Sequence, residues 1–160
     1  MHGDIIFLHG ASSAGKSTIA RALQKALDAP FLHVSIDHFR HAGVLPLDEI
    51  RSGRFDWPAM REPFFDGFHR SLPAFASSGN NLIVEHIVET KEWMSSLLAL
   101  LAPFDVFFVA VHCPLSELER REAARGDRRA GDARKDFATI HLDLVYDLEL
   151  NGIDFPQVNV

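Results

Sequence analysis

The chain has 160 residues, of which 47% are hydrophobic and 24% are charged, and its formal net charge is -6. This length and composition indicate one globular domain over residues 1–160, exclude a disordered chain, and argue against a general nucleic-acid-binding surface. The longest apolar stretch is interrupted by Pro103 and Asp105, so it is too short to span a membrane. Cys113 is the single cysteine and the N-terminus lacks the basic region of a signal peptide, so we expect a cytoplasmic protein.

Short apolar runs alternate with helical patterns along the chain. The apolar runs predict strands at 4–9, 31–36, 82–84 and 105–111, and a weaker one at 144–150. Helical spacing predicts a helix from Lys16 to Leu27, and further helices are expected at 58–76, 91–101, 114–124 and 133–142. The stretch 41–57 mixes glycine, proline and charge, which favours an irregular loop over the site. This alternation predicts an α/β fold, with helices on both faces of a parallel sheet.

A phosphate-binding loop follows the first predicted strand. Gly10 to Ser17 matches the pattern G-x-x-x-x-G-K-[ST] in full, and a helix is expected to begin at its lysine, a context that a chance glycine-rich turn would lack. Glycines allow successive N–H groups to point at phosphate oxygens, and the helix N-terminus adds its positive dipole end. We predict that Lys16 reaches the β- and γ-phosphates of ATP or GTP and that Ser17 binds Mg²⁺. The predicted nucleotide-binding residues here are Gly10, Ala11, Ser12, Ser13, Ala14, Gly15, Lys16, Ser17 and Thr18.

Two acidic residues close predicted strands that should lie beside this loop. Asp37 follows the second strand, where it is either the base for an attacking hydroxyl or an N-cap of the next helix, and the residues alone leave both open. Glu85 closes the third strand, as in a Walker B strand with Glu in place of Asp. Glu85 is a candidate for holding a metal-bound water. The alternative is a carboxylate that only faces solvent at the strand end, and the expected position at the crevice favours the first role.

An arginine-rich segment with two glycines, over residues 120–135, is predicted to form a lid. Arg121, Arg125 and Arg128 are the phosphate-binding candidates, because the planar guanidinium group matches phosphate oxygens. Arg120 and Arg129 fit the alternative, a solvated helix face paired with glutamates. The nine histidines show no convincing metal-ligand spacing, so we expect core, surface or substrate-contact roles for them, including His38 and His86.

Together these residues resemble the chloramphenicol phosphotransferase-like proteins, which are ATP-dependent O-phosphotransferases of the P-loop kinase class. The matching features are the Ser12–Ser17 core of the loop, Asp37, the acid after the third strand, Arg125-Gly126-Asp127-Arg128 with Ala130-Gly131, and His141 followed by Tyr146-Asp147. The chain departs from the family in having Glu85-His86 where aspartates are expected. It also has Asn151-Gly152 where the family has an Asp-Thr pair before a further helix.

The resemblance implies a P-loop NTPase fold of the nucleoside-monophosphate and shikimate kinase type, with a central parallel five-stranded sheet. It also implies that Asp37 is the catalytic base and that the lid arginines close over ATP. The predicted catalytic residues are then Asp37, Lys16, Arg125 and Arg128, with ATP and Mg²⁺ as cofactors and Ser17 and Glu85 as metal residues. The predicted substrate is a small hydroxylated molecule, with an antibiotic such as chloramphenicol as one candidate.

Two alternatives remain at this level. A kinase of a metabolite or a nucleotide sugar would use the same residues. A nucleotide-dependent regulator acting on a protein partner would need switch loops that sense the γ-phosphate. This second alternative is less favoured, because no Asp-x-x-Gly sequence of the GTPase type follows the third predicted strand.

Overall fold

The computed structural model of the chain describes residues 2–125 and 131–154. Its strands are β1 (Ile5–His9), β2 (Phe31–Ser35), β3 (Asn81–His86), β4 (Val106–His112) and β5 (Leu148–Asn151). Its helices are α1 (Lys16–Ala26), α2 (Ile36–His41), α3 (Leu47–Arg51), α4 (Trp57–Ser77), α5 (Lys91–Leu101), α6 (Leu115–Arg125) and α7 (Asp132–Thr139). None of the described helices, including the 21-residue α4, has both the length and the apolar character that crossing a membrane requires.

The strands form one five-stranded sheet in the order β2-β3-β1-β4-β5, and every neighbouring pair is parallel. At the centre, Ile5 of β1 lies opposite Leu82 of β3 on one side and Val106 of β4 on the other. The predicted parallel five-stranded sheet is therefore confirmed.

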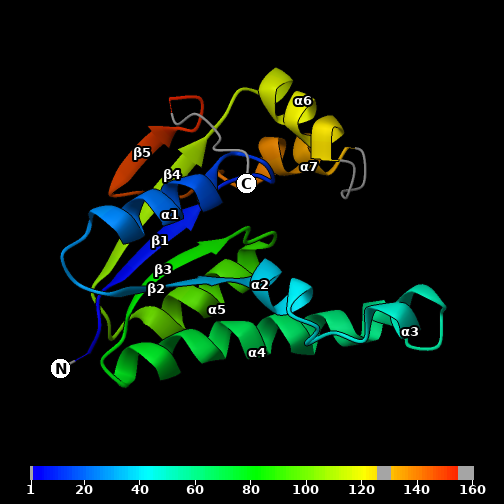
Figure 1. Cartoon of the computed structure of the whole chain (residues 1–160), viewed down its shortest axis with the longest axis horizontal. Helices are drawn as coiled ribbons and strands as arrows, with labels where there is room; N and C mark the ends of the chain where they lie inside the picture. Colours follow the sequence, from blue (N-terminus) through cyan, green and yellow to red (C-terminus); the bar gives the residue numbers. More distant parts are fainter. Residues whose placement is uncertain (1, 126–130, 155–160) are drawn as a thin grey trace.

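Helices cover both faces of the sheet (Figure 1). Alternate residues of β1 point to opposite faces. Ile5 and Phe7 join a core with residues of α4 and α5, whereas Leu8 joins a second core with Ile19 of α1 and Leu118 of α6. Because the sheet is buried on both faces, its strands consist of nearly continuous apolar runs. Their positions could therefore be predicted from the sequence.

The carboxyl ends of the strands meet along one edge of the sheet. The chain leaves β1 through the phosphate loop, and the strands on either side of it, β3 and β4, come later in the sequence. Ligands of open α/β sheets bind in the crevice outside the strand ends, at the point where the strand order reverses. The residues that follow β1, β2 and β3 therefore form the candidate site.

The stretch 41–57 was predicted to be an irregular loop, but it contains the short helix α3. Asp48 and Glu49 occupy the first turn of α3, and Arg51 lies in its last turn. Acidic residues at a helix N-terminus and basic residues at its C-terminus both interact favourably with the helix dipole. This arrangement accounts for a short helix where glycine, proline and charge indicated a loop.

Strand β5 begins at Leu148, later than the predicted start at residue 144. The backbone N–H of Asp147 donates to the carbonyl oxygen of Phe108 (2.9 Å), and its carboxylate accepts from the backbone N–H of Phe108 (2.7 Å). Both contacts involve Phe108, so Asp147 fixes the entry to the strand with its side chain. Regular pairing then begins where Leu148 lies opposite Val109.

Candidate active site

The phosphate loop links β1 to α1, and its residues 10–16 are buried. Gly15 has φ 104° and is the N-cap residue of α1, a left-handed conformation that favours glycine. A Cβ atom at Gly10 would lie 2.4 Å from the carbonyl oxygen of Val111, closer than any side chain tolerates. Both glycines of the motif are therefore required by this backbone.

Lys16 begins α1 and is almost fully buried, with 8% of its surface exposed. Its Nζ donates hydrogen bonds of 2.7 Å to the carbonyl oxygens of both Gly10 and Ala11. These bonds hold the ammonium group against the loop. Thr18, another predicted nucleotide contact, is half-buried in the first turn of the same helix.

Ser17 and Glu85 meet across the crevice. The Ser17 hydroxyl donates to Glu85 Oε1 (3.0 Å), and Glu85 is the fifth residue of the six-residue β3, opposite Leu8 of β1. Burial alone would raise the pKa of Glu85, but His33, the charge of Lys16 and the bond from Ser17 lower it to about 2. Glu85 is therefore a buried, ionised carboxylate beside the phosphate loop, not a solvent-exposed strand end.

Asp37 lies in the first turn of α2, directly after β2. Its backbone N–H donates to Ser35 Oγ (3.2 Å), so Ser35 is the N-cap residue, and the idea that Asp37 caps this helix is wrong. The carboxylate of Asp37 lies 3.5 Å from Nη1 of Arg40, one helical turn further on. The strand end thus brings Asp37 to the same edge of the sheet as Glu85.

Among the three phosphate-binding candidates of the lid, Arg121 is the one whose side chain the structure describes. It is buried, and its guanidinium group donates to Glu117 Oε1 (2.6 Å), to the carbonyl of Ser13 (3.2 Å) and to that of Gly152 (3.4 Å). Arg121 thus contacts the phosphate loop through its backbone, and its predicted phosphate contact stays a prediction. Arg120 forms an exposed pair with Glu117, as the surface alternative expected.

The remaining lid predictions lie outside what can be described. Residue 125 ends α6, but its side chain falls outside the described part of the structure, as does the whole of Arg128. The predicted roles of Arg125 and Arg128 in phosphate binding and catalysis therefore stay predictions.

Two acidic residues hold the lid helices in place, one by joining α6 to α7 and one by joining α7 to the phosphate loop, and no sequence pattern indicates either contact. Glu122 of α6 accepts hydrogen bonds from the backbone N–H groups of Gly131 and Ala133, both 2.9 Å, at the start of α7. Asp136 of α7 is buried and accepts from the backbone N–H of Ser12 (3.2 Å). Burial raises the pKa of Asp136. A partner 124 residues away cannot be inferred from local patterns.

Gly152, just after β5, packs directly against the phosphate loop. Its backbone N–H donates to the carbonyl of His112 (2.7 Å). A Cβ atom there would lie 1.8 Å from the carbonyl oxygen of Ala14. At this departure from the family pattern, the backbone of Gly152 therefore lies in close contact with the backbone of the phosphate loop.

We expect Gly152→Ala to lower the free energy of unfolding by about 1–3 kcal/mol, the usual cost of forcing extra atoms into a packed site. Urea unfolding measures this change. The matched control is Gly67→Ala within α4, where an added Cβ meets nothing within 4 Å and should stabilise the helix by about 0.5–1 kcal/mol. Equal stabilities of the two variants would contradict the close approach of Gly152 to the loop.

A partly buried polar cluster joins His9, the residue before the loop, to the segment between α7 and β5. His9 Nδ1 lies 2.9 Å from the Tyr146 hydroxyl, which lies 2.7 Å from His141 Nδ1. Burial, together with the charges of His141 and Lys16, lowers the pKa of His9 to about 3. Burial and His112 lower the pKa of His141 to about 4. His9 and His141 are therefore neutral in the folded protein near neutral pH.

We expect the protein to lose stability as the pH falls below about 6.5. Unfolded histidines take up protons near pH 6.5, whereas folded His9 stays neutral down to about pH 3. The stabilisation from neutral His9 is therefore full above about pH 6.5. Between about pH 6.5 and about pH 3, the free energy of unfolding falls by about 1.4 kcal/mol per pH unit for one such histidine.

Urea unfolding at about pH 7 and about pH 5.5 measures this loss. His9→Asn should reduce the difference between the two pH values by about 1 kcal/mol. His2→Asn, at an exposed position, should leave the difference unchanged. Equal unfolding free energies of the wild type at both pH values would refute the assignment.

Comparison with known proteins adds family and fold information. The family model for chloramphenicol phosphotransferase-like proteins matches residues 3–157. A protein of Mycobacterium tuberculosis strain H37Rv, named "Putative O-phosphotransferase Rv2636", is 32% identical over 173 residues. The alignment covers 96% of this chain and 77% of that protein.

Solved kinase structures share the fold. The Mycobacterium tuberculosis APS kinase CysC, in complex with AMPPNP and APS, superposes with a TM-score of 0.64 at 22% identity, covering 93% of this chain and 88% of that one. A gluconokinase from Sinorhizobium meliloti 1021 gives a TM-score of 0.61 at 17% identity, covering 92% and 81%. The fold is therefore that of the P-loop kinases, as predicted.

Proposed function

The chain belongs to the chloramphenicol phosphotransferase-like family, and from this premise we propose that it transfers the γ-phosphate of ATP to a hydroxyl group of a small molecule. The observation that carries the proposal is the 3.0 Å contact between Ser17 of the phosphate loop and the ionised Glu85. A phosphate loop alone indicates nucleotide binding, whereas a carboxylate beside its serine also supports phosphoryl transfer.

The oxygen atoms of Ser17 and Glu85 fit a Mg²⁺ ion, which prefers oxygen ligands. Glu85 Oε2 is buried and makes no hydrogen bond in the described part of the chain, so it has acceptor capacity for a metal-bound water. When bound, Mg²⁺ would neutralise negative charge on the phosphates of the nucleotide. Ser17 and Glu85 would hold this ion between the loop and β3.

In the proposed reaction, the hydroxyl oxygen of the acceptor attacks the γ-phosphorus, the bond from this phosphorus to the bridging oxygen breaks, and ADP leaves. Asp37 takes the hydroxyl proton, and Lys16 stabilises charge on the β- and γ-phosphates. The lid arginines Arg121, Arg125 and Arg128 would neutralise the transferring group. Catalysis then depends mainly on positioning and charge stabilisation, as is usual for phosphoryl transfer.

For the acceptor we propose a hydroxylated antibiotic, with chloramphenicol as the first candidate because of the family. A metabolite or a nucleotide sugar would use the same donor site. We also propose a cytoplasmic location, which is supported by the buried, unpaired thiol of Cys113.

The test is a screen for ATP consumption with Mg²⁺ and a panel of hydroxylated compounds, with chloramphenicol first and sugars and nucleotide sugars after it. Mass spectrometry of each acceptor identifies the phosphorylated product. GTP in place of ATP tests the choice of nucleotide. The proposal fails if no acceptor is phosphorylated while a partner protein stimulates nucleotide hydrolysis, since that result favours the regulatory alternative.

A further inference from the structure

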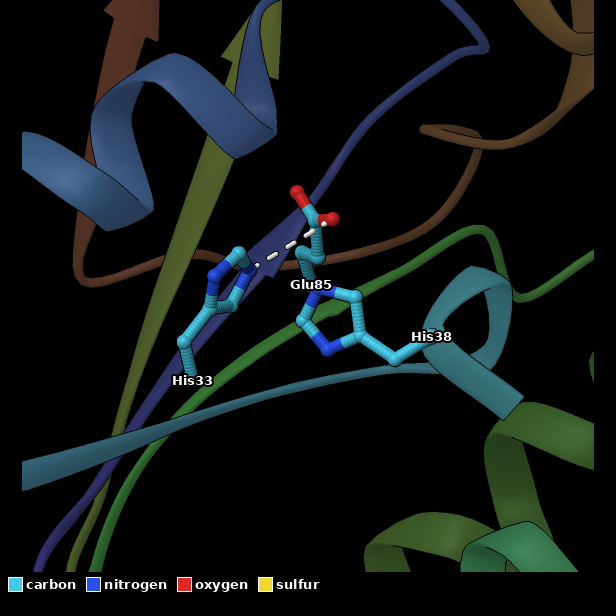
Figure 2. Close-up of side chains that lie close together, drawn as sticks. All are labelled: His33, His38 and Glu85. Carbon is cyan, nitrogen blue, oxygen red and sulfur yellow. Dashed lines mark ion pairs between the residues drawn. The ribbon is translucent and has the colours of Figure 1, made fainter. Parts of the chain in front are cut away.

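Three side chains of types that commonly ligate metals converge beside the phosphate loop from separate elements. His33 lies in β2, His38 in α2 and Glu85 in β3, and the side chains approach one another in the crevice (Figure 2). One ligand atom from each lies within 4.8 Å of the other two. Sequence analysis missed this cluster because it compared histidines that are close along the chain, whereas these residues meet through the pairing of β2 with β3.

We infer that His33, His38 and Glu85 form a binding site for a divalent transition-metal ion of the Zn²⁺ type. Two imidazoles and one carboxylate are a common three-residue ligand set for zinc, with a water as the fourth ligand. Mg²⁺ prefers an all-oxygen environment, so the two histidines select against it. The site is therefore chemically distinct from the Mg²⁺ position proposed at Ser17.

The distances support this ligand set. Zinc bonds of about 2.0–2.2 Å place neighbouring ligands of a tetrahedral site about 3.3–3.6 Å apart. His33 Nε2 and Glu85 Oε1 already lie 3.4 Å apart, with side chains 9% and 8% exposed. His38 is the exposed member of the cluster, and its ligand atom lies within 4.8 Å of those of the other two residues.

The hydrogen bonding of the buried ligands also favours a metal ion. In the described structure Glu85 Oε2 is buried without a hydrogen-bond partner, and the buried His33 Nε2 contacts the other oxygen of the same carboxylate. A buried polar atom without a partner is destabilising, so such atoms are normally satisfied in folded proteins. A metal ion placed between His33 Nε2 and Glu85 would engage this carboxylate, including its oxygen without a partner.

The shared ligand Glu85 connects this site to the nucleotide. Glu85 also accepts the Ser17 hydrogen bond, so a transition-metal ion would withdraw negative charge from the carboxylate that Mg²⁺-ATP needs. This step rests on the proposed function. It predicts that Zn²⁺ and Mg²⁺-ATP weaken each other's binding, by about 5- to 150-fold if the coupling has the usual size.

Metal binding is measured first, on the nucleotide-free protein in the presence of excess Mg²⁺. Zn²⁺ affinity is obtained by competition with a chromophoric chelator, and Co²⁺ reports the ligand geometry through its visible absorption. His38→Gln should weaken Zn²⁺ binding at least tenfold and abolish the four-coordinate Co²⁺ spectrum. Because His38 is exposed, this variant should fold, and circular dichroism verifies that it does.

The matched control is His112→Gln, which removes a histidine paired with Glu149 outside the cluster. This variant should bind Zn²⁺ like the wild type. The inference is overturned if His38→Gln binds Zn²⁺ as tightly as the wild type, or if His112→Gln is the variant that loses binding.

A separate titration with a fluorescent ATP analogue distinguishes the metal site from the proposed kinase function. It uses a buffer that contains Mg²⁺ and has been freed of transition-metal ions. Nucleotide binding without Zn²⁺ binding would overturn only the metal site. Zn²⁺ binding without nucleotide binding would overturn only the proposed function.

Discussion

Asp37→Asn should lower kcat for phosphoryl transfer by about 10²- to 10⁴-fold, the usual contribution of a general base. Asparagine cannot take the proton of the acceptor hydroxyl at neutral pH. Asn is nearly isosteric with Asp, and the Ser35 cap uses the backbone N–H of residue 37, so the cap should survive the change. The expected loss therefore reports proton transfer, and nucleotide affinity should change little.

The measurement is the initial rate of product formation with an acceptor identified by the screen, together with titration of the ATP analogue. Asp48→Asn on α3 is the matched control, because Asp48 has the same relation to Arg51 (3.4 Å, three residues apart) that Asp37 has to Arg40. This variant should retain wild-type kcat. Full transfer by Asp37→Asn would show that another group takes the proton.

The predictions that the structure confirms come from local patterns. The strands were visible because a sheet buried on both faces requires continuous apolar runs, as in Ile5 to Leu8. The phosphate loop was visible because tight backbone contacts leave room only for glycine at Gly10 and Gly15. The crevice position of Glu85 followed from its place at the carboxyl end of a parallel strand.

The features that were missed depend on contacts between distant parts of the chain. Asp136 reaches Ser12, Gly152 meets Ala14, and His33 meets Glu85 only after the sheet and lid helices have assembled. None of these pairs has a fixed spacing that a pattern could detect. The loop motif therefore predicts where phosphate binds, whereas the residues that support the loop are seen only in the folded structure.

Lys16→Ala should lower kcat/KM for ATP by about 10²- to 10³-fold, the usual cost of removing one donor that stabilises the transition state. The substitution removes the positive charge proposed to meet the β- and γ-phosphates. It also removes the buried donor to the carbonyl oxygens of Gly10 and Ala11, which lose these bonds inside the folded protein. The expected loss therefore combines the missing charge with weaker support of the loop.

Two further variants test whether the ammonium group of Lys16, rather than its apolar stem, is what matters, and urea unfolding reports the change in stability. Lys16→Met keeps the long apolar stem but not the charge, so it should be as inactive as Lys16→Ala if the ammonium group is what matters. Lys25→Ala, an exposed lysine in the last turn of the same helix, should retain wild-type kcat/KM. Steady-state kinetics and urea unfolding are measured for all three variants. Wild-type kinetics in Lys16→Met would show that the stem of Lys16 supports the loop and that its charge does not act on the phosphates.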